Sequence, residues 1–271
     1  VTPIRIHKVF AGDYWTDGGA MLGVLPWALW SRKIEVDERR RKKLNLNSLL
    51  ILTGERVILV DTGLGNRLSD KQKDIYRPSG FMLPVSLAEL GISDTDVTDV
   101  VLTHLHFDHA GGVVTGFGDG DRLTFPRARH WIQASEWNMA KDPDEVNRAS
   151  YNFDQQLALL EARARYELIQ GDAEIAPGVR LHLTGGHTVG SQIVEIEAED
   201  GFYIYAADII PTMFHTALAI TSAYDVCRRE TTAAKEYIYT RLRERQGRLL
   251  LNHDPQHWEL PVTQLPLPRA R

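Results

Sequence analysis

The sequence has little cysteine, no long apolar run and no excess of positive charge. Its 271 residues include one cysteine, Cys227, so the chain forms no intrachain disulfide, which favours a reducing, cytoplasmic location. Export after removal of a leader is left open by the sequence. The longest apolar segment, Met21–Trp30, is interrupted by Gly23 and Pro26 and falls short of the roughly 18 residues that span a membrane. The net charge of −5 argues against a general nucleic-acid binder.

Linkers, internal repeats and low-complexity segments are also missing, so we expect a single domain over residues 1–271. Apolar and β-branched runs between turn signals predict strands at residues 4–10, 48–53, 56–60, 99–103, 179–183, 192–197, 202–206 and 248–251. Apolar residues at helical spacing and helix-ending signals predict helices at residues 84–90, 135–140, 151–169 and 229–245. This order of strands and helices predicts an α+β fold in which two sheets pack together with helices outside.

Ligand-type side chains crowd the loop that follows the fourth predicted strand. His104, His106, Asp108 and His109 fill four of six positions, and the alternation of His104 and His106 lets both point the same way. Neutral imidazole suits zinc and similar metals, and a carboxylate completes a hydrolytic ligand set. The alternative is a histidine-rich surface loop. The apolar strand that precedes the loop and the glycines that follow it favour a tight, buried metal loop instead.

Three later strand ends carry further candidate ligands. His187 lies in a glycine-flanked turn after the predicted strand at residues 179–183. Asp208 follows the apolar strand at residues 202–206, and His253 follows the strand at residues 248–251. A buried carboxylate without a partner is costly, so Asp208 is expected to have one. Taken alone, His187 could equally be an ordinary turn residue. Together with the first motif, these strand ends predict one metal site.

The spacing and order of these seven residues resemble the metallo-β-lactamase superfamily over nearly the whole chain. The resemblance implies a four-layer αβ/βα sandwich of two mixed β-sheets flanked by helices, with two metals at one edge. It implies that the first metal is held by His104, His106 and His187, the second by Asp108, His109 and His253, and that Asp208 bridges both. Residues 61–63 match the Asp-x-Gly turn found early in members of this superfamily. The resemblance implies that Asp61 supports the metal loop and is not itself a ligand.

Within that superfamily the sequence resembles the lactonase branch, which includes N-acyl-homoserine lactone hydrolases and methyl parathion hydrolases. The segments that carry this likeness are residues 106–112, 207–212, 252–255 and 23–26. Class B β-lactamases usually lack a bridging acid, whereas this chain has Asp208. The flavo-diiron branch replaces the second motif histidine by glutamate, whereas this chain keeps His106. The chain departs from some lactonases at Pro211, where they place a tyrosine, and at Val189 and Ser191, where proline and histidine are common.

The resemblance also implies a mechanism. Two metals would lower the pKa of a shared water, so that a bridging hydroxide attacks a lactone carbonyl near neutral pH. One metal would polarise the carbonyl oxygen, and Asp108 would relay a proton to the leaving alkoxide as general acid. We expect two Zn²⁺ ions, with Mn²⁺, Co²⁺ and Fe²⁺ as alternatives that the same donors suit. The sequence therefore predicts a two-metal hydrolase that opens N-acyl-homoserine lactones or related lactones.

An apolar pocket is expected beside the metals, because the acyl tail of such a substrate needs one. The candidate lining residues are Met21, Leu22, Trp27, Phe107, Met213 and Phe214, for which core packing is the alternative. His215, which follows Asp208 closely in the sequence, is expected to reach the same pocket.

Two other functions are weighed against the lactonase. One is a phosphotriesterase or arylesterase that uses the same dinuclear site, and the other is a non-catalytic metal-binding protein, against which the complete ligand set argues. The expected partners are a small-molecule lactone or ester and, because the segment Met21–Trp30 is so apolar, a second copy of the chain in a homodimer.

Overall fold

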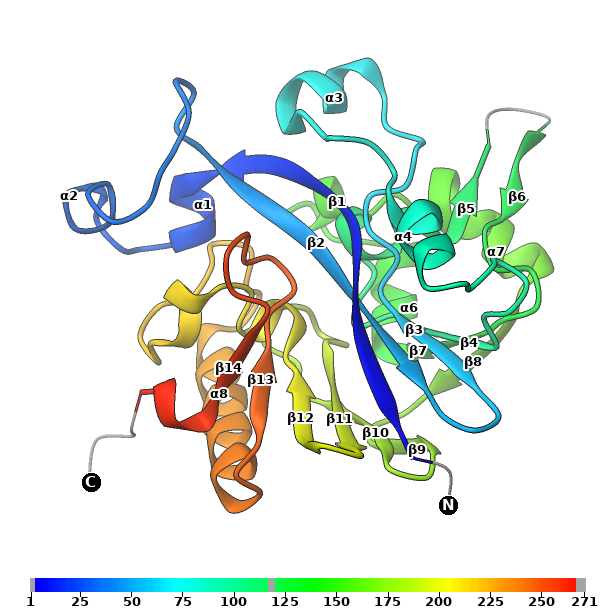
Figure 1. The fold of residues 1–271 in the computed structure, drawn as a ribbon. Helices are drawn as coiled ribbons and strands as arrows, with labels where there is room; N and C mark the ends of the chain where they lie inside the picture. Colours follow the sequence, from blue (N-terminus) through cyan, green and yellow to red (C-terminus); the bar gives the residue numbers. More distant parts are fainter. Residues whose placement is uncertain (1–2, 117–119, 267–271) are drawn as a thin grey trace.

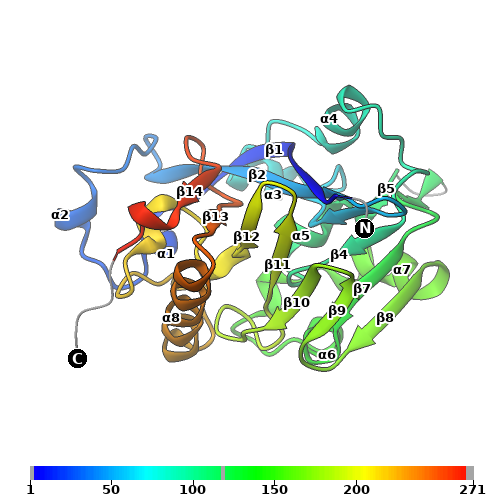
Figure 2. The ribbon, with the colours of Figure 1, turned by 60° about the horizontal axis from the view of Figure 1, so that its bottom comes forward.

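Two six-stranded mixed sheets face each other in the computed structural model, which describes residues 3–116 and 120–266 (Figures 1 and 2). The first sheet has the order β1 (Arg5–Asp17), β2 (Arg41–Leu52), β3 (Val57–Val60), β4 (Asp99–Val101), β7 (Arg129–Gln133), β8 (Arg165–Ile169). The second has the order β14 (Glu259–Pro261), β13 (Arg248–Leu250), β12 (Gly201–Tyr205), β11 (Gln192–Ala198), β10 (Val179–Leu183), β9 (Ala173–Ala176). A small ribbon is formed by β5 (Val114–Thr115) and β6 (Arg122–Leu123).

Helices flank both sheets, and α8 lies along the second sheet (Figure 2). The α-helices are α1 (Gly18–Leu22), α2 (Trp27–Trp30), α3 (Asp70–Tyr76), α4 (Leu83–Glu89), α5 (Phe107–Ala110), α6 (Ala134–Lys141), α7 (Ala158–Arg163) and α8 (Arg228–Glu244). Among the helices of the described ranges, none combines the length and the apolar character needed to cross a membrane.

Buried apolar side chains fill three layers between four layers of secondary structure. Ile51 of β2 and Ile196 of β11 lie in the layer between the two sheets. Leu87 of α4 belongs to the layer between the first sheet and its helices, and Ile238 of α8 to the layer beneath the second sheet. Each sheet thus buries both faces, one against the other sheet and one against helices. This confirms the predicted four-layer αβ/βα sandwich.

The strand ends bring the candidate ligands to one edge of the sandwich. β12 and β13 run parallel, with Tyr205 opposite Leu250. Asp208 and His253 lie equally far beyond that pair, so both leave the second sheet at the same edge. The backbone N–H of Gln192 donates to the carbonyl of Thr103 at 2.9 Å, which joins the two sheets there. Candidate ligands that are far apart in the sequence therefore lie close together in space.

Most predicted elements are present near the expected residues. The hairpin of β2 and β3 pairs with Leu52 opposite Val57, and β10 has the predicted bounds. Helices α4, α6 and α8 also lie where the sequence places them. Strands β1 and β2 are longer than predicted, because they pair with each other as far as Asp17 and Arg41, with an irregularity after Phe10. Strands β5, β6, β7, β9 and β14 were not predicted, nor were helices α1, α2, α3 and α5.

The helix predicted at residues 151–169 is wrong. The structure has a π-helical turn at Phe153–Leu157, the short helix α7, and then β8, which pairs in parallel with β7 at the edge of the first sheet. Leu157 and Leu160 are buried as a helical face requires, but Leu168 is 40% exposed and belongs to the strand. Hydrogen bonding to the sheet edge overrides the local helical spacing, which residues 164 and 168 continue only by coincidence.

Candidate metal centre

The loop that carries the first four candidate ligands is fixed at its start by Asp61. This residue follows β3 with a φ of 61°, which is rare for a residue with a side chain and has to be held by its surroundings. Its carboxylate accepts hydrogen bonds from the backbone N–H and the hydroxyl of Thr103, both at 2.9 Å. It also accepts one from Nδ1 of His109 at 2.9 Å. One buried carboxylate therefore orients both the loop and a candidate ligand on it.

His104, His106 and His187 form the first cluster, and all three side chains are buried. Nδ1 of His106 lies 3.1 Å from Nε2 of His187. Nε2 of His104 is buried and has no hydrogen-bond partner among the residues that the structure describes. Burial lowers the pKa of His104, and burial together with His187 lowers the pKa of His106 to about 3. Burial opposes a charged ring at His187 too, but Asp208 and Asp225 raise its pKa. Buried imidazole nitrogens that converge in this way suit a divalent metal ion.

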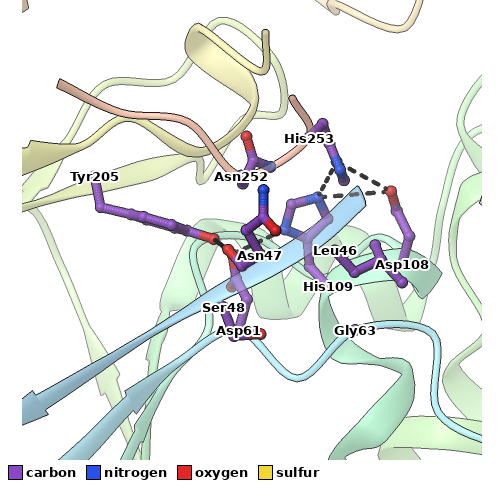
Figure 3. Close-up of a pocket in the computed structure, with 10 residues that line it drawn as sticks. All are labelled: Leu46, Asn47, Ser48, Asp61, Gly63, Asp108, His109, Tyr205, Asn252 and His253. Carbon is purple, nitrogen blue, oxygen red and sulfur yellow. Dashed lines mark hydrogen bonds and ion pairs between the residues drawn. The ribbon is translucent and has the colours of Figure 1, made fainter. Parts of the chain in front are cut away.

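Asp108, His109, His253 and Asp208 form the second cluster. Nε2 of His253 lies 3.2 Å from Nε2 of His109 and 3.4 Å from Oδ2 of Asp108. Figure 3 shows the side chains of His253, His109 and Asp108 turned toward one another. Although burial opposes a charged ring, Asp208 and Asp108 raise the pKa of His253 to about 9. The carboxylates of Asp108 and Asp208 thus bring negative charge directly to the histidines of this cluster.

Asp208 faces both clusters. Its Oδ1 lies 3.3 Å from Nε2 of His109 and 3.2 Å from Nε2 of His253, whereas its Oδ2 lies 3.3 Å from Nε2 of His187. The Asn252 amide donates to Oδ1 at 2.6 Å and fixes the carboxylate. Burial works against the charge, but His253, His109 and His187 hold the pKa of Asp208 well below its usual range. Two oxygens directed at two clusters are the geometry of a bridging ligand.

Three of the candidate histidines are oriented by a contact to their second ring nitrogen. Nδ1 of His187 lies 2.8 Å from Oδ1 of Asp225, and Nδ1 of His253 lies 2.7 Å from the backbone carbonyl of Asn45. With Asp61 on Nδ1 of His109, each of the three rings has an acceptor on Nδ1. The acceptor favours the proton on Nδ1 and leaves Nε2 as a donor atom for a metal.

The donor set fits two divalent metal ions. One cluster offers three imidazoles, the other offers two imidazoles and a carboxylate, and Asp208 can join them. Imidazole and carboxylate donors suit zinc, manganese, cobalt and iron, so the residues themselves do not select one metal.

The backbone beside Asp208 is strained. Ala207, the preceding residue, has a φ of 46°, so a second residue with a positive φ, after Asp61, lies next to the candidate ligands.

Sequence reasoning missed several polar residues that complete the centre. The hydroxyl of Tyr14, on β1, donates to Oδ2 of Asp108 at 2.6 Å and is buried. Asp225 and Asn252 contact His187 and Asp208 as described above. A polar residue in a turn, or a tyrosine in an alternating strand, has no distinctive spacing in the sequence. The one available signal was Asn252, because it directly precedes His253.

The predicted pocket residues are divided by the structure. Phe107 lies in α5 between His106 and Asp108, and its ring centre is 4.9 Å from that of Tyr76. Met21 and Leu22 are buried in the core of the first sheet, and Phe214 packs against the same core. Met213 is partly exposed and its backbone N–H bonds to Asp254. Phe107 is the one of these side chains that flanks the candidate ligands directly.

Trp27 and His215 have contacts that differ from the prediction. Trp27 lines a separate surface cavity of about 220 Å³ with Trp30 and Arg40, and no residue of the two clusters lines that cavity. His215 is buried, with Nδ1 at 2.8 Å from the Thr212 hydroxyl and Nε2 at 2.8 Å from the carbonyl of Met21. Both ring nitrogens are therefore used within the protein, and none is left for a substrate.

Comparison with known proteins identifies relatives of the chain. The profile of the metallo-beta-lactamase superfamily matches residues 42–262. An N-acyl homoserine lactonase of a Bacillus species is 30% identical over 162 residues, covering 55% of this chain and 57% of that protein. The chain thus spans a little over half the length of the lactonases it matches. A probable metallo-hydrolase of Mycobacterium tuberculosis is 27% identical over 231 residues, covering 76% of this chain and 70% of that protein.

Solved structures share the architecture. A probable metal-dependent hydrolase of Staphylococcus aureus superposes with a TM-score of 0.89 at 28% identity, covering 96% of this chain and 93% of that one. An N-acyl homoserine lactone hydrolase with N-hexanoyl-L-homoserine at its catalytic metal centre gives a TM-score of 0.74 at 21% identity, covering 94% of this chain and 95% of that one. At that identity the second likeness shows the common fold.

Proposed function

The chain belongs to the metallo-beta-lactamase superfamily as a metal-dependent hydrolase, and from that premise we propose that it opens the ring of a lactone. The observation that carries the dinuclear part of the proposal is the placement of Asp208, whose two oxygens face the two clusters. The buried His104 and His106, whose lowered pKa values keep them neutral, and the carboxylates of the second cluster support it further. N-acyl-homoserine lactones are the first substrates to test.

Support for a lactone substrate comes from the relatives. The curated N-acyl homoserine lactonases match this chain at about 30% identity over 162 residues. The segments 106–112 and 207–212, which resemble lactonases in sequence, contain several of the candidate metal ligands, including Asp208. A lactone also suits a centre with two clusters, because its carbonyl oxygen and its ring oxygen can be stabilised at two adjacent points.

The residues of the chain provide the proton path. Two divalent ions, when bound, would activate water and polarise the substrate carbonyl. Tyr14 holds Oδ2 of Asp108, the oxygen that also faces His253, so this carboxylate is fixed at the edge of the second cluster. Asp108 would pass a proton from the attacking water to the leaving ring oxygen. Water supplies the acyl oxygen and the two protons, the ring carbon–oxygen bond breaks, and one hydroxy acid results.

A substrate panel tests the proposal. Zinc-loaded protein is assayed with N-acyl-homoserine lactones of several chain lengths, γ- and δ-lactones, aryl esters, phosphotriesters and β-lactams. We expect kcat/KM to be highest for a lactone and to be abolished by a chelator. Faster turnover of phosphotriesters or aryl esters than of every lactone would overturn the lactone assignment and leave a two-metal hydrolase of another substrate class.

A further inference from the structure

Glu136, near the start of helix α6, is a buried carboxylate whose hydrogen-bond partners, within the part of the chain that the structure describes, are all neutral. It is 1% exposed. Its Oε1 accepts hydrogen bonds from the backbone N–H of Leu105 at 3.0 Å and the hydroxyl of Tyr151 at 2.9 Å. Its Oε2 accepts them from the hydroxyl of Thr188 at 2.6 Å and the backbone N–H of Gly190 at 3.1 Å. These bonds satisfy the oxygens without supplying an opposite charge.

These donors lie in the two loops that carry the first cluster. Leu105 separates His104 from His106, and Thr188 directly follows His187. Each oxygen of the carboxylate accepts two hydrogen bonds. The carboxylate therefore connects the loop that contains His104 and His106 to the loop that contains His187. Glu136 also binds the hydroxyl of Tyr151, and the ring centre of Tyr151 lies 5.1 Å from that of His106.

The backbone is shaped for this contact. A Cβ atom at Gly190 would lie 2.4 Å from Cβ of Glu136 and 2.6 Å from its backbone nitrogen, so a larger residue could not occupy this position without a shift. The loop after His187 therefore packs directly on the start of α6, which places Glu136 between the two ligand segments. This close packing makes the connection rigid.

The charges of the two clusters are unequal in a way that Glu136 corrects. The second cluster includes the carboxylates of Asp108 and Asp208, with Asp61 behind His109. The first contains three imidazoles, and the carboxylates that contact them, Asp225 and the shared Asp208, both lie at His187. Among the described residues no carboxylate forms a hydrogen bond or ion pair with His104 or His106, so a buried anion that binds the loops of these histidines would offset part of the charge of a divalent ion held there.

We propose that Glu136 is a positioning residue of the three-histidine metal site, which sets the affinity of that site without being a ligand. It orients both ligand loops and supplies a buried negative charge that a bound dication offsets. The inference rests on the two-metal centre of the proposed function and is independent of the substrate. The removal of this charge would therefore weaken one metal site more than the other.

The test is a metal titration of Glu136→Gln. An amide keeps the size of the side chain but removes the charge and replaces one acceptor oxygen by a donor, which faces a backbone N–H whichever way it is turned. Metal-free protein is titrated with Zn²⁺ against a chromophoric chelator, and with Co²⁺ while its visible absorption is recorded. We expect one of the two ions to bind roughly 10–100-fold more weakly, with a changed Co²⁺ spectrum, as for other outer contacts of metal ligands.

The matched control is Glu195→Gln. Glu195, on β11, is also a buried carboxylate, but Arg241 and Tyr237 bind it on the face of the second sheet beside α8. This variant shows what the same substitution costs at a buried site away from the metals. Glu195→Gln should have a lower unfolding free energy in urea than the wild type, but the same affinity for both metal ions. Equal metal affinities in Glu136→Gln, Glu195→Gln and the wild type would overturn the inference.

A milder variant covers the case in which Glu136→Gln does not fold. Tyr151→Phe removes one hydrogen bond to Oε1 and keeps the ring beside His106. A smaller loss of affinity at the same site is expected, and an unchanged affinity and Co²⁺ spectrum would count against the inference. A wild type that binds no divalent ion would instead contradict the proposed function itself, so the two failures are distinguishable.

Discussion

At the scale of single residues, Tyr14 has the contact most directly connected to the chemistry. Its hydroxyl donates to Oδ2 of Asp108, and its ring centre lies 5.9 Å from that of His253. Burial and the neighbouring Asp108 raise the pKa of Tyr14, so the phenol stays protonated and donates. The hydrogen bond therefore fixes a candidate ligand and proton carrier from the β1 side.

Tyr14→Phe should lower kcat/KM roughly 10–100-fold with both metals still bound, because a hydrogen bond to a charged group contributes about 1.5–3 kcal/mol. Tyr203→Phe is the control, since this hydroxyl also donates to a carboxylate, but that of the exposed Asp200 before β12, which belongs to neither metal cluster. Its activity should match the wild type. Steady-state kinetics with metal analysis of each variant make the comparison, and unchanged kinetics in Tyr14→Phe would exclude the role.

The candidate ligands were predictable from the sequence, whereas the residues that orient them were not. Four residues that can bind a metal, within six positions, form a pattern that chance rarely produces, and the later ligands each follow an apolar strand. Tyr14, Asp225 and Glu136 act through contacts to residues distant in the sequence. Such contacts depend on how the two sheets are packed, which no local spacing encodes.

At the scale of elements, β7 contains a histidine whose burial makes the fold sensitive to acid. His130 is fully buried against the helices of the first sheet, and burial lowers its pKa to about 4. An unfolded histidine has a pKa near 6.5. Between about pH 6.5 and pH 4 the unfolded chain binds a proton that the folded chain does not, so stability falls as the pH falls through this window.

His130→Leu should remove that part of the acid sensitivity. From pH 7 to pH 5 the wild type should lose roughly 2 kcal/mol more unfolding free energy than the variant, because only the wild type carries this histidine. Urea unfolding of both proteins at the two pH values measures the difference, in which the shared metal-site histidines cancel. Equal losses in the two proteins would show that His130 is readily protonated in the folded state.

Helix α8 fixes the segment after Asp208 through Lys235. The buried ammonium group donates to the carbonyls of His215 at 2.7 Å and Ile220 at 2.5 Å. Lys235→Met would leave these carbonyls without their donor and should cost about 3 kcal/mol of unfolding free energy. Lys141→Met, which removes the partly exposed ion pair with Glu161, should change it by less than about 1 kcal/mol. Similar urea midpoints for the two variants would contradict this role of Lys235.

The elements were predicted best where one pattern dominated. Short buried strands such as β10 carry period-two or continuous apolar runs, and α8 is long enough for its helical period to be clear. Residues 151–169 misled because a helical period runs across the boundary between α7 and β8. The edge of the first sheet decides that boundary, and the sheet forms from strands spread over the whole chain.

At the scale of the whole molecule, the segment with α1 and α2 projects from the sandwich (Figures 1 and 2). Val24 is 69% exposed and Leu29 is 58% exposed on it. We propose that this segment packs against a second copy of the chain, since exposed apolar patches commonly mark protein contacts. Light scattering should give twice the mass of the 30.6 kDa chain. Leu29→Glu should shift the mass to a monomer, and a monomeric wild type would refute the proposal.

The central claim is that two sheets bring seven residues from four strand ends into one dinuclear centre. Metal analysis of purified protein, with His106→Ala and Asp208→Ala measured beside the wild type, tests it most directly. We expect close to two divalent ions per wild-type chain, about one in His106→Ala, and weakened retention of both in Asp208→Ala, because Asp208 faces both clusters. A wild type that hydrolyses its substrate with no bound divalent ion would contradict it.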